Sequence, residues 1–182
     1  MTKCCLAGLM AFCSLLVLGC ASINMRVTNL QAEAIEKLHI SVDGRDVGAV
    51  NYNFGPLWPN VARSASVVGS NPQEIIIDWE SGGVAHRKAL KLSRKSSQLI
   101  QGGPERLLVF VSERQIPLLF IDFRDSPKNK SRYYNIQGEK LSKDDVEVLD
   151  ILTSYDLDKV KANSEMLKIW ANKKAALMKA DE

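Results

Sequence analysis

Apolar and polar residues alternate along much of the middle of the chain, a pattern that predicts short β-strands. Leu38–Val42 and Val47–Tyr52 both alternate in this way. Asp43-Gly44 stands between them, and glycine accepts the positive φ that tight hairpin turns need. These residues give the clearest hairpin in the sequence. Ala32–Lys37 fits either one helical turn or the approach to the first strand, and we expect the approach.

Two further hairpins follow. Glu74–Trp79 predicts a strand with Trp79 on the same face as two isoleucines, and Gly82-Gly83 turns the chain into a second strand that ends at Leu92. Arg106–Ser112 and Ile116–Phe123 are apolar runs that look buried on both faces, so we place them at the centre of the sheet. With a last short strand near Arg132–Ile136, the pattern predicts a mainly β fold, an antiparallel sandwich or a curled sheet.

The pattern becomes helical at Ser142, which stands three residues before Asp145 and resembles a capping box. Two C-terminal α-helices are expected. The second starts near Asp156, or at Ser164 if the chain kinks there, and its apolar face carries Val160, Leu167, Trp170 and Leu177. We expect this face to pack on the sheet. The alternative is a protruding helix that meets a partner or a lipid surface.

The first residues form a separate pattern. Lys3 precedes an apolar run, Leu6–Leu18, which has the length of a signal-peptide core and is too short for a membrane span. Val17-Leu18-Gly19-Cys20 resembles the lipobox of bacterial lipoproteins. This resemblance implies that residues 1–19 are removed and that Cys20 is lipidated. An ordinary secretory signal or an uncleaved anchor are the alternatives.

The same resemblance implies a cellular location and a division of the chain into segments. Ala21 and Ser22 follow the cysteine where inner-membrane members of the family often carry Asp, so the periplasmic face of the outer membrane is expected. Residues 20–31 are predicted to form a lipidated tether, residues 32–140 a β-rich domain and residues 141–182 a helical segment.

The amino-acid composition excludes several kinds of chemistry for the mature domain. All the cysteines (Cys4, Cys5, Cys13 and Cys20) lie in or at the end of the leader, so the mature domain has no thiol for a disulfide, a nucleophile or zinc. Without Lys3 the chain has 23 basic and 21 acidic residues, a balance that predicts no nucleic-acid partner.

No recognised catalytic motif is present, and we predict no catalytic residue, metal or cofactor. His39 and His86 are the side chains that titrate near neutral pH. Four acids at strand ends could pair as catalytic carboxylates if their strands adjoin: Asp78, Glu80, Asp122 and Asp125. Asp43–Asp46 is interpreted as a turn and not as a calcium loop.

The best binding surface in the sequence is an aromatic loop with Phe54, Leu57 and Trp58, flanked by prolines. A plug over one end of the sandwich is the structural alternative.

Pro72–Trp79, Leu92 and the paired apolar strands resemble small β-rich bacterial lipoproteins, some found beside type VI secretion genes. The leading hypothesis is a non-enzymatic, membrane-anchored envelope lipoprotein that binds another envelope protein. The alternatives are an envelope hydrolase or small-ligand binder, or a type VI accessory or immunity protein.

Overall fold

The computed structural model describes residues 21–50, 55–56, 59–67, 71–104, 106–123, 132–154 and 156–180. Cys20, the aromatic loop of Phe54, Leu57 and Trp58, and Asp125 lie outside these ranges, so the predictions for them remain predictions.

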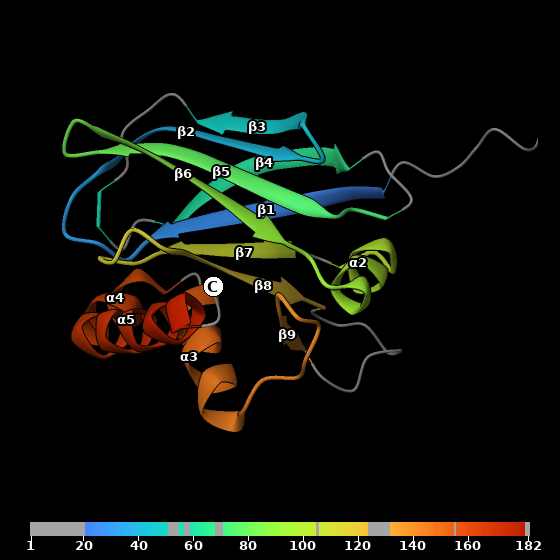
Figure 1. Ribbon diagram of the computed structural model, residues 1–182. Coiled ribbons are helices and arrows are strands. Elements are labelled where there is room, and N and C mark those ends of the chain that lie inside the picture. The colour runs from blue at the N-terminus through green and yellow to red at the C-terminus, as the bar shows by residue number, and fades with distance from the viewer. Residues whose placement is uncertain are drawn as a thin grey trace, which may run out of the picture.

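The fold is mainly β with C-terminal helices, as predicted, and is built on two sheets (Figure 1). One sheet has the order β4-β1-β7-β8-β9 and comprises β1 (Ala21–Asn29), β4 (Pro59–Val67), β7 (Arg106–Val111), β8 (Pro117–Asp122) and β9 (Tyr133–Asn135). The other has the order β3-β2-β5-β6 and comprises β2 (Ile35–Val42), β3 (Arg45–Val50), β5 (Glu74–Ser81) and β6 (Val84–Lys91). Among these strands, β1 and β7 form the parallel pair.

The predicted hairpins are confirmed. β2 and β3 join at Asp43-Gly44, β5 and β6 at Gly82-Gly83, and β7 pairs with β8 along its whole length. The two sheets pack face to face over one apolar core. Trp79 and Ile77 of β5 and Val109 of β7 are all at most 2% exposed within this core.

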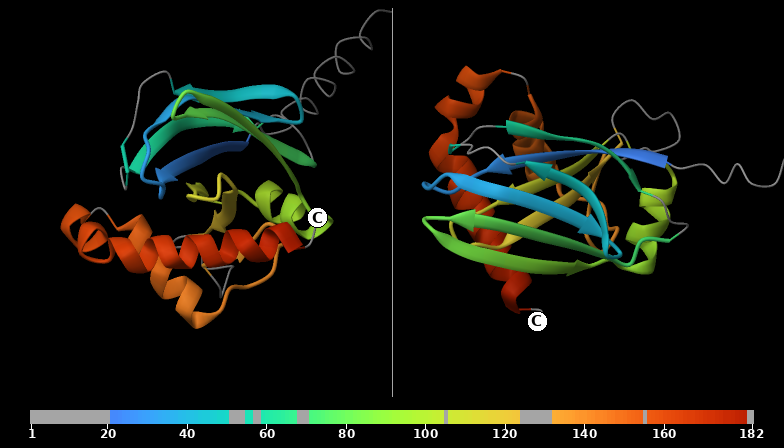
Figure 2. Two further views of the ribbon diagram at one scale, coloured as in Figure 1. Left: turned by 60° about the vertical axis from the view of Figure 1, so that its left-hand side comes forward. Right: turned by 90° about the horizontal axis from the view of Figure 1, so that it is seen from above.

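The helical layer covers the other face of the five-stranded sheet (Figures 1 and 2). It consists of α3 (Lys143–Thr153), α4 (Leu157–Ala162) and α5 (Ser164–Ala180). A second apolar core joins Leu108, Phe110 and Phe120 of the sheet to Leu149 and Leu167 of the helices. β7 therefore contributes to both cores, which explains its uninterrupted apolar sequence. The expected docking on the sheet is confirmed for Val160, Leu167 and Trp170, but Leu177, predicted to lie on the same packing face, is 57% exposed.

Helix ends follow the predicted local chemistry. The hydroxyl of Ser142 accepts from the backbone N–H of Asp145 at the start of α3. The second helical stretch is divided at Asn163, so α4 and α5 are separate helices. No helix in the described ranges is both long and apolar enough to cross a bilayer.

The prediction that residues 21–31 form a linker is wrong. Residues 21–29 are β1, which lies inside the sheet between β4 and β7. Met25 and Val27 face the core between the sheets, while Arg26 and Thr28 are buried on the helical side. The strand looks polar because Arg26 is buried against the Thr153 carbonyl and not in water.

Two further elements were not predicted. β4 occupies a stretch rich in serine and alanine that gave no strand pattern, and it pairs with β1. α2 (Arg94–Gln101) follows β6; its N-cap is Ser93, whose hydroxyl accepts from the backbone of Ser96.

Candidate functional site

The two histidines lie on opposite faces of the four-stranded sheet. His39 is on the outer face, with its Nε2 3.3 Å from Asp46 and its Nδ1 3.7 Å from Asp78. His86 pairs with Trp79 across β5 and β6 and stacks on its indole, with ring centroids 5.1 Å apart. They cannot act on one substrate together.

The candidate carboxylates of the described residues are divided between the two sheets. Asp78 and Glu80 are on the outer face of β5, where Arg87 and Lys37 contact them at 3.3 and 2.8 Å. Asp122 belongs to β8, in the other sheet. The Asp43 carboxylate accepts from the backbone N–H groups of Gln73 and Glu74, so it joins the β2–β3 turn to the start of β5.

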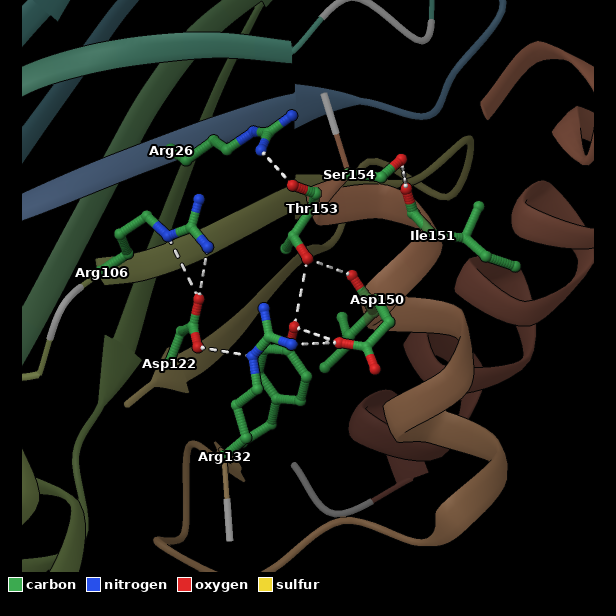
Figure 3. A network of polar contacts seen from close by, with 10 residues as sticks. Arg26, Arg106, Asp122, Arg132, Asp150, Ile151, Thr153 and Ser154 are labelled. Atoms are coloured by element: carbon green, nitrogen blue, oxygen red, sulfur yellow. Dashed lines mark hydrogen bonds and ion pairs between the residues drawn. The ribbon is translucent and has the colours of Figure 1, made fainter. Parts of the chain in front are cut away.

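Asp122 is fully buried and contacts two arginines (Figure 3). Arg106 donates from Nε and Nη2 to Oδ2 at 3.1 and 2.7 Å, and Arg132 lies 3.4 Å from Oδ1. This arrangement engages both carboxylate oxygens, so Asp122 does not have the freedom of a general acid or base. Its role is to compensate buried guanidinium charge.

The same network reaches the helical layer. Arg132 also donates to Asp150 of α3 at 2.7 Å, and the Tyr133 hydroxyl donates to the same oxygen at 2.8 Å. Burial raises the pKa of Tyr133 well above its ordinary value, so the hydroxyl stays protonated and keeps this bond. Arg26 of β1 donates to the carbonyl of Thr153 at 3.0 Å. The network therefore holds α3 against the sheet.

A groove of about 880 Å³ lies on the open side of the sandwich. One wall is β6, and the other is formed by β8, the segment after β9, and α5. Its apolar floor includes Leu90, Leu118, Leu119 and Phe120. At the opposite edge of the sandwich, β3 and β4 contact each other, which closes that side.

β6 forms an exposed edge of its sheet. Within the described residues it pairs only with β5, and Ala85, Arg87, Ala89 and Lys91 are exposed. An exposed edge explains why apolar and charged residues alternate imperfectly along this strand. Lys88 and Lys91 line the groove on this side.

α5 forms the facing wall with Lys174 and Leu177. The Lys174 ammonium lies 2.7 Å from the carboxylate of Asp145, which fixes the side chain over the groove. Leu177 is 57% exposed, an unusual position for a leucine at the rim of an apolar floor. The groove thus combines an open strand edge, apolar side chains and ammonium groups, with Glu139 as an acid among its lining residues.

No group of three or more acidic, histidine or cysteine side chains in the described residues could hold a metal ion. Comparison with known proteins gave no family model, no curated protein and no solved structure that matches the chain.

Proposed function

We propose that this chain is a lipid-anchored protein of the bacterial envelope that binds an extended, acidic segment of another envelope protein along β6. The observation that supports it best is the position of an eight-residue exposed edge strand beside the groove. Binding, not catalysis, is the proposed activity, since the two histidines lie on opposite faces of the sheet and the candidate acids Asp78, Glu80 and Asp122 are all paired with basic side chains.

The edge of β6 offers backbone hydrogen bonds. β5 uses the N–H and C=O groups on one side of β6, and alternate residues direct theirs away from the sheet. Such an edge can accept a strand from another chain, which is a common mode of peptide recognition. A segment bound there would continue the four-stranded sheet over the groove.

The side chains suggest the chemistry of that segment. β6 carries Arg87, Lys88 and Lys91 and no acidic residue. Lys174 adds an ammonium from the facing wall. Arg87 and Lys174 already contact Asp78 and Asp145 at 3.3 and 2.7 Å. Lys91 is therefore the position best suited to contact an acidic residue of a partner strand, and the exposed Leu177 an apolar one. The lysines also disfavour pairing between two copies of β6, since like charges would then face each other.

The lipid anchor is supported by the resemblance of residues 17–20 to a lipobox. Acyl chains on Cys20 would contribute about 0.8 kcal/mol per buried CH₂, so several chains make a lasting anchor. A role as a type VI accessory or immunity protein remains a prediction within this proposal.

A photo-crosslinking residue tests the binding surface in living cells. When it replaces Ala85, Arg87 or Ala89 in turn, it should crosslink to the same partner. Each step of two residues along β6 should move the crosslinked site by two residues along the partner strand. The matched control is Lys159 on α4, an equally exposed position outside the groove. Crosslinks that are equal at Lys159, or that scatter without register, contradict strand addition.

A further inference from the structure

We infer that the end of the sandwich formed by the start of β1 and by α2 lies against the phospholipid headgroups, and that it sets the orientation of the domain on the membrane. This inference rests on the lipidation of Cys20 in the proposed function. In this arrangement the folded domain contacts the bilayer directly. The sequence alone predicts a tether that keeps the domain away from the bilayer.

The start of β1 leaves no room for a tether. β1 begins at Ala21, the residue after Cys20, and Ala21 is in register with Val67 of β4. Neighbouring Cα atoms are about 3.8 Å apart, so lipidation of the residue before Ala21 would bring the start of β1 close to the bilayer. Acyl chains on Cys20 would place this strand end at the level of the headgroups.

α2 lies at the same end (Figures 1 and 2). β7 begins at Arg106, which is in register with Asn24 of β1, and α2 ends only a few residues earlier, at Gln101. The hydroxyl of Ser97 also donates to the carbonyl of Pro72. The start of β1 and α2 are thus parts of one surface.

The chemistry of α2 suits headgroups better than hydrocarbon. Its exposed residues are Arg94, Lys95, Gln98 and Gln101, and the helix has no acidic residue. Its single fully buried apolar residue, Ile100, faces the core. The β2–β3 turn is at this end too and carries both an acid, Asp43, and a base, Arg45. Each basic residue near an anionic leaflet increases the association constant for the membrane by about fivefold.

The opposite end of the sandwich faces away from the membrane. β1 ends at Asn29, which donates to the carbonyl of Glu33, and Glu33 in turn accepts from Ser81 at the end of β5. Val84, the first residue of β6, is therefore far from Cys20. The β6 groove opens on the side between these two ends, where an envelope protein can reach it.

The lack of thiols in the mature domain permits a direct test with the full chain, since Cys20 would be blocked as a thioether. A fluorophore is attached at Gln98→Cys on α2 or at Val84→Cys at the far end, and the lipidated proteins are reconstituted in vesicles of phosphatidylethanolamine and phosphatidylglycerol. A nitroxide on the lipid headgroup should quench the label at 98 severalfold more than the label at 84. Equal quenching, or stronger quenching at 84, overturns the inference.

Two further measurements separate the possible failures. Replacing Arg94 and Lys95 by glutamine should reduce quenching at 98, while the same change at Lys159 and Lys161 of α4 should not; equal effects overturn the role of α2. The mass of each protein is determined first. A chain without acyl mass refutes the lipid anchor and this orientation with it, whereas an acylated chain with the label at 98 unquenched refutes the orientation alone.

Discussion

The Lys174 ammonium of α5 lies 2.7 Å from the Asp145 carboxylate in the first turn of α3. Trp170, one turn earlier on α5, donates to the other oxygen of the same carboxylate at 2.8 Å. Asp145 is only 7% exposed, so one acid joins the two helices and positions the α5 wall of the groove.

Replacing this acid should loosen α5. Asp145→Asn keeps the shape but removes the charge that Lys174 faces, and we expect a loss of about 1–2 kcal/mol in the free energy of unfolding. Asp144→Asn is the matched control, because Asp144 is an exposed acid in the same helical turn. It should change stability by less than about 0.5 kcal/mol in the same urea titration. Equal losses for the two variants would contradict the pairing.

The same acid should make stability depend on pH. Burial opposes the charged form of Asp145, but hydrogen bonds from Lys174, Trp170 and Ser142 outweigh it and hold its pKa below the ordinary value of 3.8. A lowered pKa in the folded state contributes stability above pH 3.8, which is lost as the pH falls through the folded pKa. The stability difference between the natural chain and Asp145→Asn should therefore shrink below about pH 4. A difference that stays constant down to pH 3 would argue against this assignment.

Asp122 should be the most sensitive ion-paired position of the fold. Asp122→Asn leaves the guanidinium of Arg106, whose side chain is 8% exposed, without its buried counter-charge. We expect a cost of about 3–5 kcal/mol. Glu80→Gln breaks a similarly short contact with Lys37 on an exposed face and should cost less than about 1 kcal/mol. Chemical denaturation of both variants measures the two losses of stability. Similar losses would mean that burial of the ion pair does not determine how much its removal costs.

The apolar side of α5 is tested by two residues that are two positions apart. Leu167 is fully buried against the sheet, whereas Ile169 is 69% exposed. Leu167→Ala should cost about 2–5 kcal/mol, and Ile169→Ala less than about 0.5 kcal/mol. Thermal unfolding of both variants measures the difference. A reversed order would mean that α5 docks through another face.

Gly138 should not tolerate a side chain, for two reasons. Its φ is +74°, and a Cβ there would lie 2.9 Å from the backbone nitrogen of Ser96 in α2. Gly44 has a similar φ of +75° but open space around it. Gly44→Ala should therefore cost about 1–2 kcal/mol from backbone strain, and Gly138→Ala about 1–3 kcal/mol more from the clash. Equal costs would show that the turn after β9 is not held against α2.

The features that were predicted correctly depend on residues that are close together in the sequence. Asp43-Gly44 fixes a hairpin, Ser142 caps the helix that follows it, and the apolar run from Arg106 to Ser112 can only be a strand buried on both sides. β1 was missed because Arg26 looks solvent-exposed in sequence, whereas its partner is the Thr153 carbonyl, 127 residues away. Such a contact leaves no local signal.

The groove could not be predicted for the same reason. Its walls come from β6, β8 and α5, which are far apart in the chain and meet only in the fold. The basic residues of β6 were the available signal, and they indicated an exposed edge without showing what lies beside it.

Hydrogen exchange measured residue by residue along β6 tests strand addition most directly. In the free protein, the amides of β6 that face β5 should exchange slowly, and the alternate amides should exchange fast. In the complex with the partner trapped through Ala89, the fast set should become protected while β3 stays unchanged. If the fast amides of β6 remain fast in that complex, the partner does not bind as a strand on this edge, and the account is contradicted.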